Sequence, residues 1–183
     1  MKNLFRRFLS RLKGEQDLNK LIKRGLKVGE NFTRMGGVII DPSHCWHISI
    51  GDNVTLAPNV HILAHDASTK VFLNYTRVAN TRIGDNVFVG AGSIVLPGVT
   101  IGNNVVIGAG SIVVSDIPDG SVVAGNPARV FKSIEAFVLE NKQKMKDGNV
   151  FGEDHTLRNS AFGYNEKAEL LKACDRFEEV FVE

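Results

Sequence analysis

The sequence predicts a mainly β fold of the solenoid class, in which short strands coil into a triangular prism. The first observation is an eighteen-residue unit that occurs twice in succession, at 83–100 and 101–118, with ten aligned positions identical. The second is an aliphatic residue at every sixth position from 83 to 113. A period of six fits neither the 3.6 residues of an amphipathic helix nor simple strand alternation. Fixed self-similarity is typical of solenoids, whose repeats bury their apolar faces against one another.

Six residues make one side of the predicted prism, and eighteen make one coil. The first residue of each hexad points inward, and burying its side chain contributes roughly 1.5–3 kcal/mol. The sequence at the corners is Asp85-Asn86 in one copy and Asn103-Asn104 in the next. Asn and Asp suit these corners because they accept left-handed backbone at low cost.

A third copy begins at Ile50 and continues through Leu56 and Ile62. From Ile62 to Ile83 is 21 residues, which is not a multiple of six. We therefore expect a loop within 65–82 to leave the prism and return. Long loops on rigid scaffolds often carry function.

The two ends of the chain do not follow the repeat. Residues 2–13, within an N-terminal segment of 1–30, have apolar residues at helical spacing between basic ones. This amphipathic helix either packs on the prism or a partner subunit, or lies on an anionic membrane surface. Residues 132–183 predict a C-terminal helical cap, with one helix ending near 147–148 and another over 167–180.

Composition sets broad limits on the function. The net charge is +2 and 43% of the residues are apolar, so nothing in the balance demands a nucleic-acid partner. Two cysteines, Cys45 and Cys174, are too few for a disulfide framework. With no long apolar run and no signal-peptide pattern, the expected location is the cytoplasm.

Four of the five histidines lie between 44 and 65. A solenoid core does not need histidine, so this cluster points to chemistry. Transfer of an acyl group from a thioester to a hydroxyl requires a base that takes the hydroxyl proton, and a neutral imidazole is suited to that task. The thioester brings its own activated carbonyl, so no enzyme nucleophile is needed.

The stretch IGDNVTLAPNVHILAHD (50–66) and the ending AGNPARV (124–130) resemble the hexapeptide-repeat acyltransferases, in the branch of the maltose, galactoside and polysaccharide O-acetyltransferases. The resemblance covers about residues 31–132. It implies a left-handed parallel β-helix over 31–131, acetyl-CoA as acyl donor, no metal, and a homotrimer with sites between subunits.

The same resemblance implies a catalytic base. Relatives carry their catalytic histidine shortly after an APxV segment, which here is Ala57–Val60, and this favours His65. The gap between the APxV segment and His65 is two residues shorter than the corresponding gap in the maltose-type enzymes. His65 therefore matches the catalytic histidine in its place in the fold, but not in its exact spacing along the sequence. The alternative for His65 is a polar residue at the rim of the loop.

In relatives, the coil that corresponds to 41–47 faces the catalytic histidine of the next subunit. The residues that the resemblance offers as acceptor contacts are Asp41, His44 and Trp46. His61 stands one place before an inward residue, and it either lines the same cleft or serves as the base instead of His65. Asp66 either orients a substrate hydroxyl or an imidazole, or serves as a turn residue. The alternative for 41–47 is an imperfect first coil with Trp46 over its edge.

For the donor, relatives hold coenzyme A in a groove between subunits. The positions that match the pantetheine contacts are Phe88, Ala91, Gly108 and Ala109, although plain coil packing also needs small residues. Arg129 and Lys132 match basic residues that meet the nucleotide phosphates, and guanidinium pairs well with phosphate. The chain departs from relatives at Phe88, often Trp, and at Ser115, usually basic.

The leading interpretation is a coenzyme A-dependent transfer of acetyl to a sugar hydroxyl. An amine acceptor, on a sugar or an antibiotic, uses the same base and stays open. A second class is a metal-dependent hydratase resembling the γ-type carbonic anhydrases, which needs three histidines converging on zinc. A third is a non-catalytic scaffold.

Overall fold

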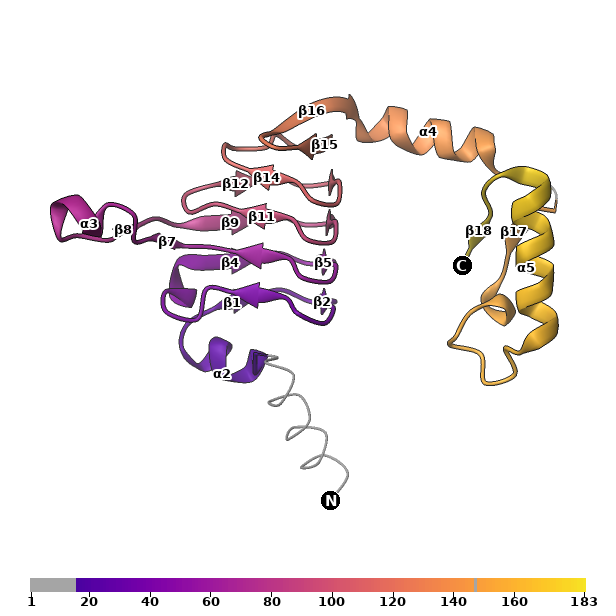
Figure 1. Ribbon diagram of the computed structural model, residues 1–183, viewed down its shortest axis with the longest axis horizontal. Helices are drawn as coiled ribbons and strands as arrows, with labels where there is room; N and C mark the ends of the chain where they lie inside the picture. The colour runs from indigo at the N-terminus through magenta and orange to yellow at the C-terminus, as the bar shows by residue number, and fades with distance from the viewer. Residues whose placement is uncertain (1–15, 147) are drawn as a thin grey trace, which may run out of the picture. The chain divides into compact units, whose positions relative to one another are not determined.

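The computed structural model describes residues 16–146 and 148–183 (Figure 1). The described chain forms two compact units that meet between Ile134 and Glu135. The amphipathic helix expected at 2–13 lies outside the described residues.

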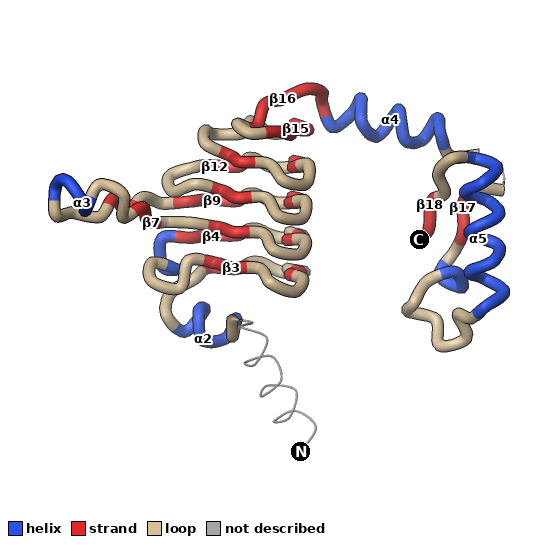
Figure 2. The backbone as a smooth tube through the Cα atoms, viewed as in Figure 1, coloured by secondary structure: helices blue, strands red, loops and turns tan. Residues whose placement is uncertain are grey.

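The first unit is a parallel β-helix with three sheets (Figures 1 and 2). The first sheet contains β1 (Lys27–Val28), β4 (Ile48–Ile50), β9 (Thr81–Ile83) and β12 (Thr100–Ile101). The second contains β2 (Thr33–Arg34), β5 (Thr55–Leu56), β10 (Val87–Val89), β13 (Val105–Ile107), β15 (Ser121–Gly125) and β16 (Ala128–Ser133). The third contains β3 (Ile39–Ile40), β6 (His61–Ile62), β11 (Ile94–Val95) and β14 (Ile112–Val113). Within these three sheets all pairs are parallel except β15 with β16, which closes the last coil.

The core is the stack of inward side chains that the hexad pattern predicts. Residues one coil apart are direct partners, as in Val89 with Ile107 and Val95 with Val113. These four side chains are fully buried. The eighteen-residue coil and its inward positions are therefore confirmed.

The corners carry a ladder of asparagines. Asn53, Asn86 and Asn104 have φ of 54°, 56° and 55°, which is left-handed backbone. Their side-chain amides bond from coil to coil, with Asn53 Nδ2 donating to Asn86 Oδ1 at 3.1 Å and Asn86 Nδ2 donating to Asn104 Oδ1 at 3.2 Å. Beside the ladder the coils approach so closely that a Cβ on Gly84 would lie 2.8 Å from the Gly102 oxygen.

The expected excursion is an arm that projects from the prism (Figure 1). From Thr55 to its partner Phe88 is 33 residues, whereas from Phe88 to its partner Val106 is 18. The extra chain forms an antiparallel pair, β7 (His65–Asp66) with β8 (Arg77–Val78), and the short helix α3 (Lys70–Leu73) between them.

The prism begins before residue 31, where the sequence pattern places its start. Lys27 and Val28 form β1 because they pair with Ser49 and Ile50 of β4. A short helix, α2 (Leu18–Lys23), precedes them, and Asp17 accepts a hydrogen bond from the Lys20 amide at its start. The least repeat-like stretch contains a 3₁₀ turn, η1 (Cys45–His47).

The second unit begins with helix α4 (Ile134–Lys144). It holds β17 (Val150–Phe151), the 3₁₀ turn η2 (Glu153–His155), helix α5 (Tyr164–Phe177) and β18 (Phe181–Val182), which pairs in parallel with β17. Two helices were expected here and are present, and the chain between them contains β17 and η2, which were not expected. Capping of the prism by this unit stays a prediction. Within the described residues, no helix has the length and apolar content to cross a membrane.

His155 joins η2 to α5 in this unit. Its Nε2 lies 2.9 Å from Glu169 Oε2, and its Nδ1 lies 3.0 Å from Asp154 Oδ1. The hydrogen bond with Glu169, followed by the close contact with the Asp154 carboxylate, raises the pKa of His155 above its ordinary value of 6.5. The protonated ring stabilises the unit at low pH, and this contribution is lost as the pH rises through the raised pKa.

We predict that the asparagine ladder depends on left-handed backbone at Asn86. Asn86→Gly removes the side-chain hydrogen bonds but still adopts the left-handed φ easily. Asn86→Ala removes the same hydrogen bonds and also adopts the left-handed φ only at a cost in energy. Both variants should be less stable than the wild type. The alanine variant should have the lower free energy of unfolding, by about 0.5–1 kcal/mol once the chain entropy of glycine is subtracted. Urea unfolding measures this, and an alanine variant at least as stable as the glycine variant contradicts it.

We also predict that His155 titrates above pH 6.5 because of Glu169. In Glu169→Gln the pKa of His155 should fall, and the unit should lose part of its added stability at low pH. Imidazole NMR across a pH series measures the titration, and urea unfolding at the same pH values measures the stability. Asp175→Asn, on the same helix, is the control and should leave the titration of His155 in place.

Candidate functional site

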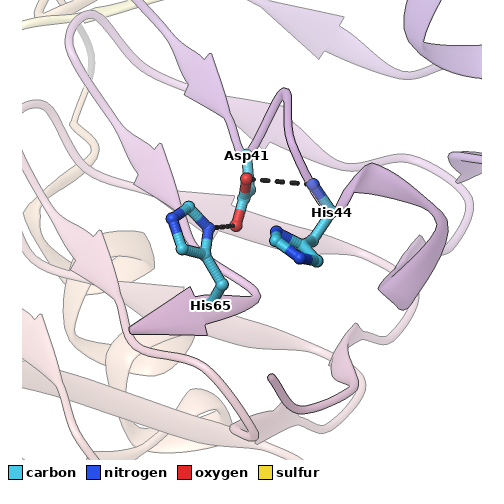
Figure 3. Close-up of side chains that lie close together, drawn as sticks. All are labelled: Asp41, His44 and His65. Carbon is cyan, nitrogen blue, oxygen red and sulfur yellow. Dashed lines mark hydrogen bonds and ion pairs between the residues drawn. The ribbon is translucent and has the colours of Figure 1, made fainter. Parts of the chain in front are cut away.

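The site is built on a contact between two neighbouring coils, at the base of the arm. Ile40 of β3 pairs with Ile62 of β6, and the amide of Asp41 bonds to the Ile62 oxygen at 2.9 Å. Asp41 therefore ends its strand beside the chain that turns out into the arm. The Nδ1 atom of His65, in β7, is hydrogen-bonded to the Oδ2 atom of Asp41 (Figure 3).

The carboxylate of Asp41 is buried, with 1% of the residue exposed. Its Oδ1 accepts the amides of Ser43 at 3.0 Å and His44 at 3.1 Å, and its Oδ2 also accepts the amide of Ala64 at 3.1 Å. Burial by itself raises the pKa of Asp41, but the hydrogen bonds from His65, Ala64 and Ser43 outweigh it, and the pKa lies below its ordinary value. The carboxylate is thus held ionised and fixed in place.

An ionised carboxylate can only accept, so His65 Nδ1 carries the proton of that hydrogen bond. The other ring nitrogen, Nε2, points away from Asp41 (Figure 3). The His65 side chain is 31% exposed, so the ring is half-buried. A neutral imidazole arranged in this way presents a lone pair at Nε2 and is fit to accept a proton.

His44 lies against the same pair. Its ring centroid is 4.7 Å from that of His65 and 5.4 Å from that of Trp46. Among the described residues, the Nδ1 atom of His44 is buried and has no hydrogen-bond partner. Asp41, His44 and His65 each offer one ligand atom, and these atoms lie within 4.8 Å of one another.

The other expected acceptor contacts lie in different surroundings. Trp46 is 49% exposed in η1. His61 stands on the third sheet, between Ile39 and Ile94 of the neighbouring coils. Asp66 is paired with Arg77 at 3.3 Å across the arm, not with His65. A hydrogen bond from the Ser68 amide is the main cause that lowers the pKa of Asp66.

The expected donor contacts lie further along the prism. Phe88 is 43% exposed on β10, and the turns that hold Ala91 and Ala109 stack, with the Gly110 amide bonding to the Ala91 oxygen at 2.8 Å. A Cβ built on Gly108 would meet the Cβ of Ala124 first, so the coils are close there too.

The two basic residues are on the closing strand β16. Arg129 is exposed and donates to its neighbour's carbonyl, the Ala128 oxygen, at 2.9 Å. The Lys132 ammonium lies 5.5 Å from the ring centre of Phe131. Both therefore stand at the C-terminal end of the coils.

Comparison with known proteins places this chain in a family. A family model described as bacterial transferase hexapeptide (six repeats) matches residues 80–115. Protein CapG of Staphylococcus aureus is 41% identical over 160 residues, covering 81% of this chain and 90% of CapG. The chain belongs to the hexapeptide-repeat transferases, in the branch of the maltose and galactoside O-acetyltransferases.

Two solved structures share the coils. A maltose O-acetyltransferase from Clostridium difficile 630 has 46% identity and a TM-score of 0.52, covering 58% of this chain and 57% of its own. The acetyltransferase VCA0836 of Vibrio cholerae, solved with acetyl coenzyme A, has 27% identity and a TM-score of 0.54, covering 60% of this chain and 61% of its own. The predicted fold class, a left-handed parallel β-helix, is confirmed.

One feature of the site differs from the sequence-based expectation. Asp41 was expected to contact the acceptor, but it is buried under the ring of His65. The hexad count could not reveal this contact, since Ile40 and Ile62 are inward partners 22 residues apart, which is not a multiple of six. The irregular stretch 41–47 lies between the two residues and lengthens this coil beyond eighteen.

Proposed function

We propose that the protein transfers an acetyl group from acetyl-CoA to a hydroxyl of a saccharide, with His65 as general base and Asp41 as the residue that positions it. The observation that carries this proposal is the Asp41–His65 hydrogen bond, which fixes the ring and leaves Nε2 directed away from the carboxylate. The family of the chain supports acyl transfer as the reaction type.

In the proposed reaction, Nε2 of His65 accepts the proton of the acceptor hydroxyl as its oxygen attacks the thioester carbonyl. The ring becomes an imidazolium, which the ionised Asp41 stabilises through Nδ1–H. The tetrahedral adduct then collapses, the carbon–sulfur bond breaks, and the thiolate of coenzyme A takes the proton from Nε2. Acetyl ends on the hydroxyl oxygen and the base is regenerated.

For the donor, we propose that acetyl-CoA lies along Phe88, Ala91, Gly108 and Ala109, with its phosphates near Arg129 and Lys132. The VCA0836 structure is a complex with acetyl coenzyme A, which supports this donor. Small residues let a narrow pantetheine arm reach the backbone, and Arg129 has an exposed guanidinium that suits phosphate.

For the acceptor, we propose contacts from His44, Trp46, His61 and Asp66, at a site completed by a neighbouring subunit of a homotrimer. A saccharide is supported by the activity named for the Clostridium difficile structure. The exposed indole of Trp46 offers an apolar face of the kind on which sugar rings pack.

We predict that His65→Ala lowers kcat by roughly 10²–10⁴, because no other group takes the hydroxyl proton. Asp41→Asn should also lower kcat, since an amide no longer holds the same tautomer of His65 in place, while KM for acetyl-CoA changes little. Mass spectrometry of acetylated maltose, galactosides and polysaccharide fragments measures the transfer.

His47→Ala is the matched control for these two variants. His47 belongs to the same turn but is bonded to Asn80 Oδ1 at 2.8 Å instead of to Asp41. Its removal should leave kcat close to wild type. Wild-type turnover in His65→Ala would place the base elsewhere.

We predict that Arg129→Ala weakens binding of coenzyme A by about tenfold and leaves the acceptor KM nearly unchanged. The physical reason is the loss of a charge-assisted hydrogen bond to phosphate. Calorimetric titration with coenzyme A measures the dissociation constant. Arg82→Ala, an exposed arginine on β9, is the control, and equal affinity in both variants contradicts the role of Arg129.

A further inference from the structure

We infer that Asp41, His44 and His65 form an inhibitory binding site for a divalent transition-metal cation such as Zn²⁺. The observation is that a carboxylate and two imidazoles converge from the end of β3, the turn before η1 and β7, with ligand atoms within 4.8 Å of one another (Figure 3). Two histidines and a carboxylate, with a fourth position open to solvent or substrate, form a common zinc ligand set.

His44 adds a third possible metal ligand to the Asp41–His65 pair. Its backbone amide bonds to Asp41 Oδ1 at 3.1 Å, which ties the turn to the carboxylate. Its buried Nδ1 has no hydrogen-bond partner among the residues that the structure describes, so a lone pair or a proton there is left unsatisfied. A buried polar atom of this kind is costly unless something binds it, and a cation held between the three side chains would do so.

The site also has the required access and support. The side chain of His65 is 31% exposed and that of Asp41 is fully buried. A cation bound by both would therefore have a buried ligand on one side and a partly exposed ligand on the other. Three amides hold the Asp41 carboxylate: those of Ser43, His44 and Ala64. Such fixing of a ligand by its surroundings strengthens metal affinity.

The expected consequence follows from the tautomers of imidazole, and rests on the proposed role of His65. The His65 nitrogen beside Asp41 is Nδ1. When Nδ1 of a neutral ring binds a cation, its single proton resides on Nε2. His65 then has no lone pair for the acceptor hydroxyl, and Asp41 is no longer its partner. No net proton is released in this exchange, and transfer stops.

The ligand set also determines which cations bind. Imidazole suits Zn²⁺, Co²⁺, Ni²⁺ and Cu²⁺, whereas Mg²⁺ and Ca²⁺ prefer sites made of oxygen. We therefore expect inhibition by micromolar-range additions of the first group at concentrations where the second group has no effect. The cation acts here as an inhibitor and not as a cofactor.

The test uses the full-length chain without a histidine tag. Zn²⁺ binding is measured by calorimetry, and Co²⁺ binding by visible absorption, both in the absence of coenzyme A because its thiol binds these metals. We expect one cation per chain. His44→Ala, and His44→Gln as the more conservative change, should weaken binding at least about tenfold. Asp41→Asn and His65→Ala should weaken it as well.

His47→Ala is the matched control, since it removes a neighbouring histidine that stands outside the three ligands. In the activity arm, acetylated product is measured by mass for each variant with and without Zn²⁺, relative to its own metal-free rate. The Zn²⁺ concentration that halves the rate should rise about tenfold in the His44 variants and stay at the wild-type value in His47→Ala.

The outcomes separate this proposal from the one on which it rests. No binding by the wild type, or equal weakening in the His44 and His47 variants, overturns the metal site. Unchanged Zn²⁺ affinity in His65→Ala, together with loss of transfer, also overturns it and leaves the catalytic proposal intact. Tight binding that depends on all three ligands, with full turnover in His65→Ala, keeps the metal site and removes the inhibitory mechanism.

Discussion

The parallel register between coils is the constraint on which the site depends. Backbone amides of one coil bond to carbonyls of the next, as Ile39 does to the Val60 oxygen at 2.9 Å and Asp41 to the Ile62 oxygen at 2.9 Å. Because side chains in a strand alternate between faces, a slip of one residue would turn every inward aliphatic outward. The core therefore locks the register, and the locked register places Asp41 beside the start of the arm. The contact between Asp41 and His65, which are 24 positions apart, is thus a by-product of core packing.

The buried charge of Asp41 is the second requirement. Removing a carboxylate from water is costly unless hydrogen bonds replace the lost solvation. Three backbone amides and His65 provide them, and the amide of Ala64 is available because the chain has left the ladder there. The same four donors that make the burial tolerable also prevent the carboxylate from rotating. The orientation of His65 is thus fixed, through Asp41, by backbone groups that belong to the fold.

Much of the fold could be predicted because its information is local. Six-residue spacing determines which side chains are inward, as Val89 and Ile107 demonstrate, and turn chemistry places left-handed backbone at Asn86 and Asn104. The excursion could be predicted from a break in the count. The partner of His65 could not, because that contact joins two coils across a gap of irregular length. The β17 strand in the second unit was missed for a related reason: two residues that pair with β18 about thirty positions later carry no periodic signal.

The place where the repeat is interrupted explains why chemistry is possible on such a regular scaffold. Within an unbroken coil the residue at the position of His65 would return to the ladder, and its ring would be packed between its neighbours. Here the chain leaves instead, and Thr81 closes the gap: its hydroxyl donates to the Leu63 oxygen at 2.7 Å and accepts the Gly98 amide at 3.2 Å. Thr81 is fully buried, and its hydroxyl both donates and accepts a hydrogen bond. The base of the arm is therefore tied to the neighbouring coils by hydrogen bonds. The core therefore stays intact where the chain leaves the prism, and His65 stands at that point with Nδ1 hydrogen-bonded to Asp41 and Nε2 directed away from it.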